Sequence, residues 1–359
     1  MTAAPMRLRL GVVFGGRSPE HEVSVVSARS ILREADPERF ETVPIAITRG
    51  GAWLGPEETA RRLARAEAGE TDAMGDEPGA GLFAYPEVLA ALQGVDVVVP
   101  IVHGRTGEDG ALQGVLEFSE KPYVGSGVGA SGVGMDKAYM RAVLAASGIP
   151  QARHVVLPDA DREGASPETA RRIEREIGYP CFVKPANGGS SVGVSKARSR
   201  EDLGEALGTA SRYDRKVLVE EAIEGREVEC AVIGNRDPEP SPVGEIRPHG
   251  EFYTYASKYG DEGADLLVPA ELSEATTRRV QEVAVDAYRA VACSGLARVD
   301  CFVTLDDQIR VIELNTLPGF TPISMYPRLW QHAGLPYRTL ISRLVDLAIE
   351  RHDEERSRA

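Results

Sequence analysis

"RVDCFVTLDDQIRVIELNTLPG", residues 298–319, has the pattern of a β-hairpin, because two alternating runs flank a polar turn at residues 306–307. A turn of two or four residues pairs positions whose numbers sum to 613, which places Asp300 directly opposite Glu313. Like charges directly opposite each other destabilise a sheet. A stable hairpin with these two carboxylates side by side therefore requires an interaction that offsets their repulsion.

The same register gives the hairpin two chemically different faces. Arg298 lies opposite Asn315 on the face that carries both carboxylates. The other face is apolar and is the side that a core would cover. Its residues are Val299, Cys301, Val303, Ile312 and Leu314.

Two facing carboxylates and an amide oxygen suit Mg²⁺, which often binds through one or two carboxylates together with substrate phosphates. Coordination would turn the repulsion between Asp300 and Glu313 into a metal site, with Asn315 as a further ligand. The alternative is a pair of solvated carboxylates on an exposed face. That alternative leaves unexplained why Arg298 and Asn315 share the face, so we predict a metal platform.

A second motif, "KPANGGSSVGV" at residues 184–194, follows a predicted strand. Glycines let backbone N–H groups approach phosphate oxygens, Ser190 and Ser191 add donors, and Lys184 supplies a point charge. The segment therefore predicts a triphosphate cradle. It is not a Walker A loop, because the lysine precedes the glycines. A flexible surface turn is the alternative.

Two polar segments follow predicted strands of the N-terminal part. In "GGRSPEHEVS", residues 15–24, Glu20 and Glu22 could receive a cation or an ammonium group, or could cap the next helix. In "VHGRTGEDG", residues 102–110, His103 comes directly after a buried strand and could be structural or catalytic.

The segment "GVGASG", residues 127–132, formally fits the dinucleotide fingerprint GxGxxG. The fingerprint also needs an acidic residue roughly 20 positions further on, and the corresponding "GIPQARHVV" contains none. We therefore interpret the segment as a connector before a helix. A nicotinamide site is the alternative.

Composition excludes some classes of partner. The 41 Lys and Arg residues against 55 Asp and Glu residues give a net charge of −14, which disfavours binding to nucleic acid or to anionic membranes. We find no signal-peptide pattern and no run of about 18 apolar residues, and we expect a soluble cytoplasmic protein. The four cysteines form no CxxC pair and are expected to be buried thiols rather than zinc ligands.

Three α/β units follow one another along the 359 residues. The first opens with a strand, a helix and a strand and continues to a buried parallel strand in "GVDVVVPIVHG". The second begins near residue 135 and the third near residue 226. Residues 56–81 are charged and weakly periodic, so we expect a mobile excursion there. The tail at residues 353–359 is expected to fray.

Six motifs occur in the order and rough spacing of D-alanine–D-alanine ligases of the ATP-grasp superfamily. They are "GGRSPEHEVS", "HGRTGEDG", "GVGASGVGMDK", "KPANGGSSVG", "RVD" and "ELNTLPGFT". The resemblance spans residues 11–325 and is specific, because the first two motifs are typical of the ligases rather than of ATP-grasp enzymes in general.

The resemblance implies an α/β protein with the three-domain ATP-grasp fold. Residues 1–135 would form the N-terminal α/β domain with the first D-alanine site. Two α+β subdomains, residues 136–223 and 224–359, would enclose the nucleotide. The closing loop would be residues 249–268, and the metal hairpin residues 298–315.

The implied activity is ATP-dependent ligation of two D-alanines through an acyl phosphate, for the synthesis of a peptidoglycan precursor. ATP is the co-substrate, and two Mg²⁺ or Mn²⁺ ions would bridge its β- and γ-phosphates. Asp300, Glu313 and Asn315 match the family's metal ligands. The resemblance also implies a cytoplasmic homodimer whose other partners are small molecules.

The resemblance places the nucleotide between the two ATP-grasp subdomains. Lys137 and Lys184 match the family's phosphate and adenine-side lysines, and Glu227 matches its ribose carboxylate. The full set of nucleotide positions is Lys137, Lys184, Ser190, Ser191, Glu220, Glu221, Ile223, Glu227 and Asn315.

The adenine edge is where this chain departs from its relatives. Glu220 and Ile223 occupy the family's adenine-edge positions. Glu221 stands where many relatives carry a lysine, and a carboxylate cannot repeat a lysine's contacts. The fine contacts to the adenine ring are therefore open.

For the first D-alanine, the resemblance pairs the ammonium with Glu20 and places the carboxylate near His103. Attack of this carboxylate on the γ-phosphate would give the acyl phosphate. The second D-alanine's amine would then attack the acyl carbon. Arg298 and the backbone N–H of Gly319 resemble the family's oxyanion-stabilising pair.

The second D-alanine's carboxylate would contact Ser324 and the backbone at Met325. Ser190 and Tyr259 fit a hydrogen-bonded chain from Glu20 to the closing loop, which would exclude water from the acyl phosphate. Lys258 would reach the transferring phosphate as a point charge.

Several alternatives stay open at this point. Within the superfamily they are another carboxylate–amine ligase or a D-alanine–D-lactate ligase. From other classes they are a dehydrogenase that uses residues 127–132 and a nucleotide-binding regulator without catalysis. The regulator is disfavoured because no metal or phosphate position is missing.

Overall fold

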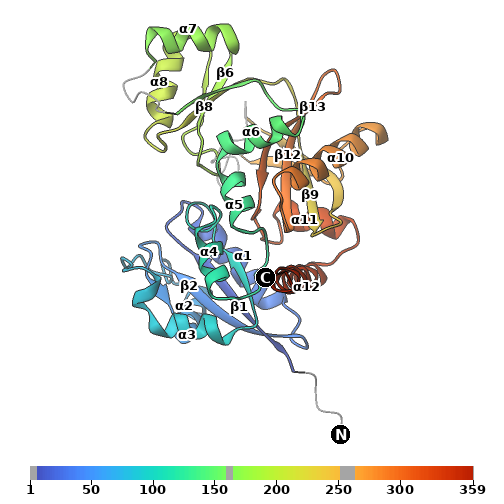
Figure 1. Cartoon of the computed structure of the whole chain (residues 1–359). Coiled ribbons are helices and arrows are strands. Elements are labelled where there is room, and N and C mark those ends of the chain that lie inside the picture. Colours follow the sequence, from blue (N-terminus) through green and yellow to red (C-terminus); the bar gives the residue numbers. More distant parts are fainter. Residues whose placement is uncertain (1–5, 159–164, 251–262, 359) are drawn as a thin grey trace.

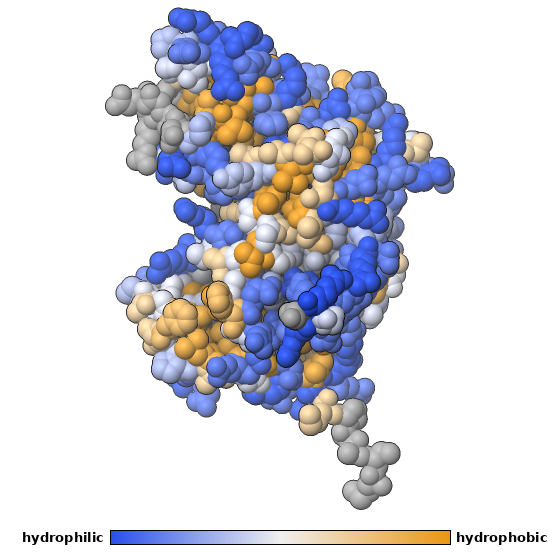
Figure 2. Space-filling view, in the orientation of Figure 1, coloured by the Kyte–Doolittle hydropathy of each residue, from blue (hydrophilic) through white to orange (hydrophobic). Residues whose placement is uncertain are grey.

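The computed structural model describes residues 6–158, 165–250 and 263–358, which contain three β-sheets (Figure 1). Each sheet comes from a different stretch of the chain. The first sheet lies at one end of the molecule, the second lies at the other end, and the third lies between them. The molecular surface is indented on one side between the part with the first sheet and the rest (Figure 2).

The first sheet has the order β3-β2-β1-β4, and its three longer strands are parallel, as the sequence predicted. Its strands are β1 (Leu8–Gly15), β2 (Phe40–Ile47), β3 (Trp53–Leu54) and β4 (Val97–Ile101). The helices of this part are α1 (His21–Glu34), α2 (Pro56–Glu67), α3 (Pro86–Gly94) and α4 (Ala111–Phe118), with a short 3₁₀ helix at Leu82–Ala84. Parallel strands end at one edge, which brings the segments after β1 and β4 together.

The expectation of a mobile excursion over residues 56–81 is wrong at its start, because α2 begins at Pro56. Proline is favoured in the first turn of a helix, and Glu57 and Glu58 lie in the same turn. Glu58 also pairs with Arg62 one turn later. These local signals outweigh the weak apolar periodicity.

The second sheet is antiparallel, with the order β5-β8-β6-β7. Its strands are β5 (His154–Leu157), β6 (Cys181–Pro185), β7 (Ser195–Ala197) and β8 (Val217–Glu221). The helices α7 (Pro167–Glu176) and α8 (Arg200–Ala210) pack their apolar sides against it. The loop at residues 188–194 joins β6 to β7. Because β6 lies next to β8 in the sheet, this loop begins beside β8.

The third sheet is antiparallel, with the order β11-β10-β9-β12-β13. Its strands are β9 (Gly225–Gly234), β10 (Glu239–Pro248), β11 (Ala264–Leu267), β12 (Gly295–Thr304) and β13 (Ile309–Asn315). Helices α10 (Glu274–Ala290) and α11 (Met325–His332) pack on its opposite faces, since Val228 and Val232 lie in the core with α10 and Ala231 and Ile233 in the core with α11.

The predicted hairpin is β12 and β13. At its functional end the pairing is as predicted, with Asp300 opposite Glu313. The turn differs, because Thr304 N donates to Gln308 O at 2.9 Å across a three-residue loop. Asp307 takes the left-handed conformation in that loop, with φ 59°.

A bulge reconciles this turn with the predicted pairing. The register shifts by one after Asp300, so Cys301 lies opposite Val311 instead of Ile312. Val311 is fully buried in the core, and Ile312 lines the cleft described below. The prediction that Ile312 belongs to the core face is therefore wrong.

The interpretation of residues 127–132 as a connector is also wrong, because most of that segment lies in helix α5 (Val128–Met135). Helix α6 (Lys137–Ala146) follows at once. Met140 and Leu144 of α6 pack in the core of the third sheet, although α6 precedes the second sheet in the chain. The domain boundaries at residues 135 and 223 stay predictions.

The C-terminal helix α12 (Tyr337–Arg356) joins the first and third sheets. Its apolar residues Leu340, Leu344 and Ala348 share one core with residues of β1, β4 and β12. The helix continues to Arg356, so the predicted fraying from residue 353 is wrong for the first part of the tail. The four cysteines are buried and unpaired, as predicted.

No helix within residues 6–158, 165–250 and 263–358 combines the length and the apolar character that crossing a membrane requires.

Candidate active site

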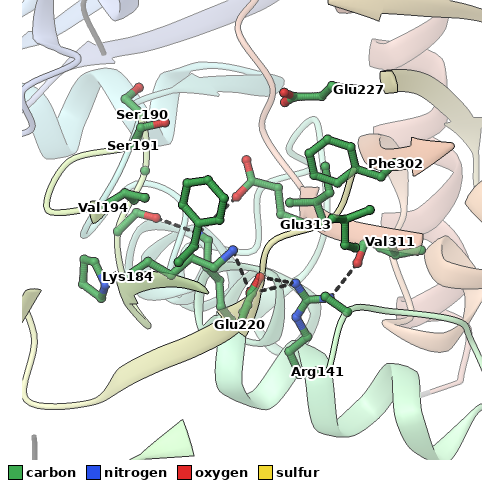
Figure 3. Close-up of a pocket in the computed structure, with 18 of the residues that line it drawn as sticks. Arg141, Lys184, Ser190, Ser191, Val194, Glu220, Glu227, Phe302, Val311 and Glu313 are labelled. Atoms are coloured by element: carbon green, nitrogen blue, oxygen red, sulfur yellow. Dashed lines mark hydrogen bonds and ion pairs between the residues drawn. The ribbon is translucent and has the colours of Figure 1, made fainter. Parts of the chain in front are cut away.

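A cleft opens between the second and third sheets, and the first turn of α6 enters it (Figure 3). The structure brings together here most of the residues with predicted nucleotide roles. Those that line the cleft are Lys137, Lys184, Ser190, Ser191, Glu220, Glu221, Ile223 and Glu227. Glu313 lines it too, and Asn315 lies two residues further along β13.

The buried carboxylate of Asp300 contacts a cation on its own strand. Arg298 donates two hydrogen bonds to Asp300, from Nε and Nη2, both at 2.7 Å. Asn315 Nδ2 donates to Asp300 Oδ2 at 3.1 Å. Asp300 is only 4% exposed, so the alternative of solvated carboxylates is wrong for this residue.

Arg298 also contacts a second carboxylate, which lies on the neighbouring strand. Its Nε lies 3.1 Å from Glu229 Oε2 on β9. Burial opposes the guanidinium charge, but the charges of Asp300 and Glu229 outweigh it and raise the pKa of Arg298 well above its usual value. Arg298 is therefore a fixed cation beside the predicted metal platform.

Lys137 spans the cleft from the start of α6. Its Nζ lies 3.2 Å from Glu313 Oε2 and donates to the carbonyl oxygen of Gly188 at 2.7 Å. The helix begins at this residue because the Asp136 carboxylate accepts hydrogen bonds from two N–H groups of the first turn. The cap thereby places a cation between the hairpin and the loop at residues 188–194, which is named the phosphate loop after its predicted role.

The floor of the cleft contains a buried carboxylate with two cations (Figure 3). Arg141 Nη2 donates to the two oxygens of Glu220 at 2.8 and 2.9 Å, and Lys184 Nζ lies 2.7 Å from Glu220 Oε1. Burial alone would raise the pKa of Glu220, but the charges of Arg141 and Lys184 lower it to about 2. Burial lowers the pKa of Lys184, against the charge of Glu220.

Glu221, next to the floor, contacts a cation outside the cleft. Arg153 donates to the Glu221 carboxylate from its backbone N at 2.8 Å and from Nε at 2.6 Å. In the close-up, Glu227 and Phe302 lie across the cleft from Ser190 (Figure 3). The wall is therefore polar on the loop side and partly aromatic on the side of the third sheet.

The phosphate loop also contacts the first sheet's part of the chain. Ser190 Oγ donates a short hydrogen bond to Glu20 Oε1. Glu20 is the N-cap residue of α1, and its side chain makes no capping hydrogen bond. Glu22 lies in the first turn, where an acid favours the helix dipole, as the capping alternative expected. Glu22 pairs with Arg49 instead of lining the cleft. Of the two predicted acids, Glu20 alone reaches the loop.

His103 is buried at the end of β4, 3% exposed, and its Nδ1 lies 3.6 Å from Glu108 Oε1. Burial lowers the pKa of His103, but the nearby carboxylate of Glu108 outweighs it, and the charge of Glu20 adds to the rise. The net pKa is raised above 6.5. The charge of Glu20 therefore acts on His103.

The predicted second-substrate residues lie after β13. Ser324 is the N-cap residue of α11, and its Oγ accepts a hydrogen bond from Thr321 N at 3.1 Å. A Cβ at Gly319 would lie 3.1 Å from Ser324 Oγ, so the two residues are neighbours. The side chain of Met325 is buried. The predicted contact with the second D-alanine involves the backbone of this residue, not its side chain. Lys258 and Tyr259 lie outside the described residues.

Comparison with known proteins places the chain in a family. The family model described as D-ala D-ala ligase C-terminus matches residues 143–346, and the model described as D-ala D-ala ligase N-terminus matches residues 9–126. The chain belongs to the D-alanine–D-alanine ligase family. The predicted resemblance and the ATP-grasp fold class are thereby confirmed.

Individual members of the ligase family match over nearly the full length. A D-alanine–D-alanine ligase of Geobacillus thermodenitrificans is 45% identical, and the match covers 98% of each chain. The solved structure of the D-alanine–D-alanine ligase from Coxiella burnetii is 35% identical, with a TM-score of 0.80 over 98% of this chain and 96% of that one. The VanG D-Ala:D-Ser ligase from Enterococcus faecalis is 30% identical, with a TM-score of 0.78 over 96% and 100%.

The donor set of the hairpin fits the predicted divalent cations. Asp300 and Glu313 supply carboxylate oxygens and Asn315 an amide oxygen, which are hard ligands. Within the described residues, no group of three or more His, Cys, Asp or Glu side chains is arranged to bind a metal ion. Two protein carboxylates with substrate phosphates are the arrangement typical of Mg²⁺.

Sequence reasoning missed two charged residues of this ligase. Arg141 lies four residues after Lys137, on the same face of α6, and that spacing is the only local signal for it. Glu108 was inside a quoted motif but was not singled out, because its contact with His103 forms only when the chain turns after β4.

We expect Glu108→Gln to lower the pKa of His103, because the carboxylate that offsets burial most strongly would be removed. In the wild type the folded pKa is raised, so the imidazolium contributes stability fully below the unfolded pKa of about 6.5, and this contribution is lost as pH rises through the folded pKa. An NMR titration of the ring, assigned with His103→Gln, measures the shift. Glu120→Gln, at an exposed residue, is the control; an unchanged His103 pKa in Glu108→Gln would contradict the assignment.

Proposed function

We propose that this chain catalyses the ATP-dependent ligation of two D-alanines to D-alanyl-D-alanine, which supplies a peptidoglycan precursor. The hydrogen bond from Ser190 to Glu20 carries the proposal. It connects the loop that would bind the phosphates to the carboxylate that would bind the first ammonium. A phosphoryl transfer to the first amino acid needs that proximity.

The nucleotide would lie in the cleft between the second and third sheets. Lys137 supplies a cation for its phosphates. Lys184 lies on the adenine side and, as the point charge of the 184–194 segment, also acts on the phosphates, while Ser191 and the glycines supply donors. Glu220 and Ile223 would contact the adenine edge, and Glu227, which lines the same cleft, would contact the ribose. These roles come from family membership together with the position of each residue in the cleft.

Asp300, Glu313 and Asn315 would bind two Mg²⁺ or Mn²⁺ ions. Such ions supply positive charge to the β- and γ-phosphates. The chain's own part is to present oxygens from two strands whose backbones are hydrogen-bonded, so that little reorganisation is needed. Lys137 contacts Glu313 and would also contact the phosphates of a bound nucleotide.

Two bond-forming steps follow. A carboxylate oxygen of the first D-alanine attacks the γ-phosphorus, ADP leaves, and an acyl phosphate forms. The amine of the second D-alanine attacks the acyl carbon, and phosphate leaves. Glu20 would orient the first ammonium, His103 its carboxylate, and Arg298 with Gly319 N–H would stabilise the oxyanion.

Ser324 and the backbone of Met325 would bind the carboxylate of the second D-alanine. We further propose that residues 249–268, with Lys258 and Tyr259, close over the site, and that the protein is a cytoplasmic homodimer; these points rest on the resemblance. The dehydrogenase alternative loses its support, because residues 128–135 form a helix and no acidic residue stands where the ribose would be bound.

The reaction is tested by measuring phosphate release with ATP and Mg²⁺ in the presence of D-alanine, of L-alanine or of no amino acid. We expect release with D-alanine alone, together with a dipeptide product. Equal release in all three mixtures would indicate a phosphatase. No release in any mixture would favour the nucleotide-binding regulator and would contradict the proposal.

We expect Glu313→Gln to reduce turnover at least a hundredfold, because a neutral amide cannot replace the carboxylate charge that the metal requires. Binding of Mn²⁺ in the presence of ADP, followed by electron paramagnetic resonance, should weaken in parallel. Asp306→Asn, at the exposed turn of the same hairpin, is the matched control and should behave as the wild type. Normal turnover and Mn²⁺ binding in Glu313→Gln would refute the metal site.

D-alanine should be the preferred second substrate at pH 7. A tyrosine at position 259 is neutral there, whereas the imidazolium of a Tyr259→His variant would attract the lactate anion and repel an ammonium. A mixture of ATP, Mg²⁺, D-alanine, D-serine and equimolar D-lactate, resolved by mass spectrometry, measures the choice. We expect mainly D-alanyl-D-alanine from the wild type and more depsipeptide from Tyr259→His. Mainly depsipeptide or D-alanyl-D-serine from the wild type would identify a different acceptor.

A further inference from the structure

Arg141 is a fully buried arginine at the floor of the cleft, and it makes contacts with two different sheets. Its Nη2 contacts both oxygens of Glu220 on β8, at 2.8 and 2.9 Å. Its Nη1 donates to the carbonyl oxygen of Val311 on β13 at 2.6 Å. Its side chain is 1% exposed, and that of Glu220 is 6% exposed. The ion pair is therefore shielded from solvent and little weakened by salt.

The charges at the floor do not cancel. Arg141 and Lys184 are cations and Glu220 is the carboxylate that both contact, so the three side chains together have a net charge of +1. Without Arg141, the pair of Lys184 and Glu220 would have a net charge of zero. The excess charge faces the cleft, because Lys184 and Glu220 both line it.

We propose that Arg141 is a positioning residue for the nucleotide: it neutralises Glu220, so that the charge of Lys184 stays available to the phosphates. This inference rests on the proposed binding of ATP in the cleft. Arg141 need not touch the nucleotide, since it acts through Glu220. An arginine suits the position because its planar fork reaches a carboxylate and a backbone carbonyl at once.

The place of Arg141 in the chain supports this role. It follows Lys137 by one turn of α6, so one helix supplies a cation near the phosphate loop and another beneath Lys184. The Asp136 cap fixes the start of this helix, and Met140 and Leu144 bury its apolar side in the third sheet's core. Arg141 is therefore placed by a rigid element rather than by a loop.

The proposal predicts a selective loss of affinity for charged ligands. In Arg141→Met we expect the Kd for ADP to rise about tenfold more than the Kd for adenosine, because the removed charge acts on the phosphates. Both Kd values are measured on the full chain by competition against a fluorescent adenine nucleotide. A purely structural role of Arg141 would weaken both ligands by the same factor.

Two further variants separate charge from packing. Arg141→Lys keeps the net charge of the floor and should keep the wild-type ratio of the two Kd values, even if its stability falls. Arg141→Met combined with Glu220→Gln restores a net charge of +1 through Lys184, and should restore the ratio although both ligands bind more weakly. Thermal unfolding of each variant verifies that the protein is folded.

The outcomes distinguish this inference from the proposed function. Equal weakening of ADP and adenosine in Arg141→Met, or no recovery of the ratio in the double variant, would overturn the role of Arg141 and leave the ATP site standing. Failure of the wild type to bind ADP at all would overturn the proposed function, and this inference with it.

Discussion

The arrangement of the cleft depends on one constraint, which is that a carboxylate removed from water must contact a cation. An uncompensated buried charge costs several kcal/mol. Asp300 and Glu229 contact Arg298, Glu313 contacts Lys137, and Glu220 contacts Arg141 and Lys184. Four of these contacts connect different elements of the chain, and two of them, Glu313 with Lys137 and Glu220 with Arg141, join α6 to the third and the second sheet. Satisfying the charges therefore also fixes how α6 and these two sheets lie around the cleft. The two facing carboxylates of the hairpin obey the same constraint, because Asp300 contacts Arg298 and Glu313 contacts Lys137.

Helix α6 shows how local sequence and tertiary packing combine at this site. A carboxylate cap begins the helix at Lys137, and the helical period brings Arg141 onto the same face one turn later. Its apolar face packs with the third sheet, while its cations contact a loop and a strand of the second sheet. The two sides of the nucleotide cleft are consequently joined by a single rigid element. Reactions that pass a phosphoryl group between two substrates depend on such fixed geometry more than on any one catalytic group.

The part of the chain with the first sheet joins this frame at two places. Helix α12 shares a core with β1, β4 and β12, so the last helix of the chain fastens the first sheet to the third. Close to the cleft, the contact between Ser190 and Glu20 links the phosphate loop to the start of α1. A change of the loop on nucleotide binding would therefore act on the carboxylate that is proposed to bind the first amino acid.

Local sequence determined those features whose cause lies within a few residues. The alternation of the hairpin predicted that Asp300 faces Glu313, because a strand has a period of two and one face had to be apolar. The motifs in their order identified the family and most of the residues that line the cleft. Tertiary structure decided the rest. The bulge that moves Ile312 out of the core depends on how a three-residue turn meets the pairing required at Asp300. The contact of Arg141 with Glu220 joins segments that only the folded chain brings together, because the two residues lie 79 positions apart in the sequence. The contact of Glu108 with His103 is close in sequence, but it depends on how the chain turns after β4.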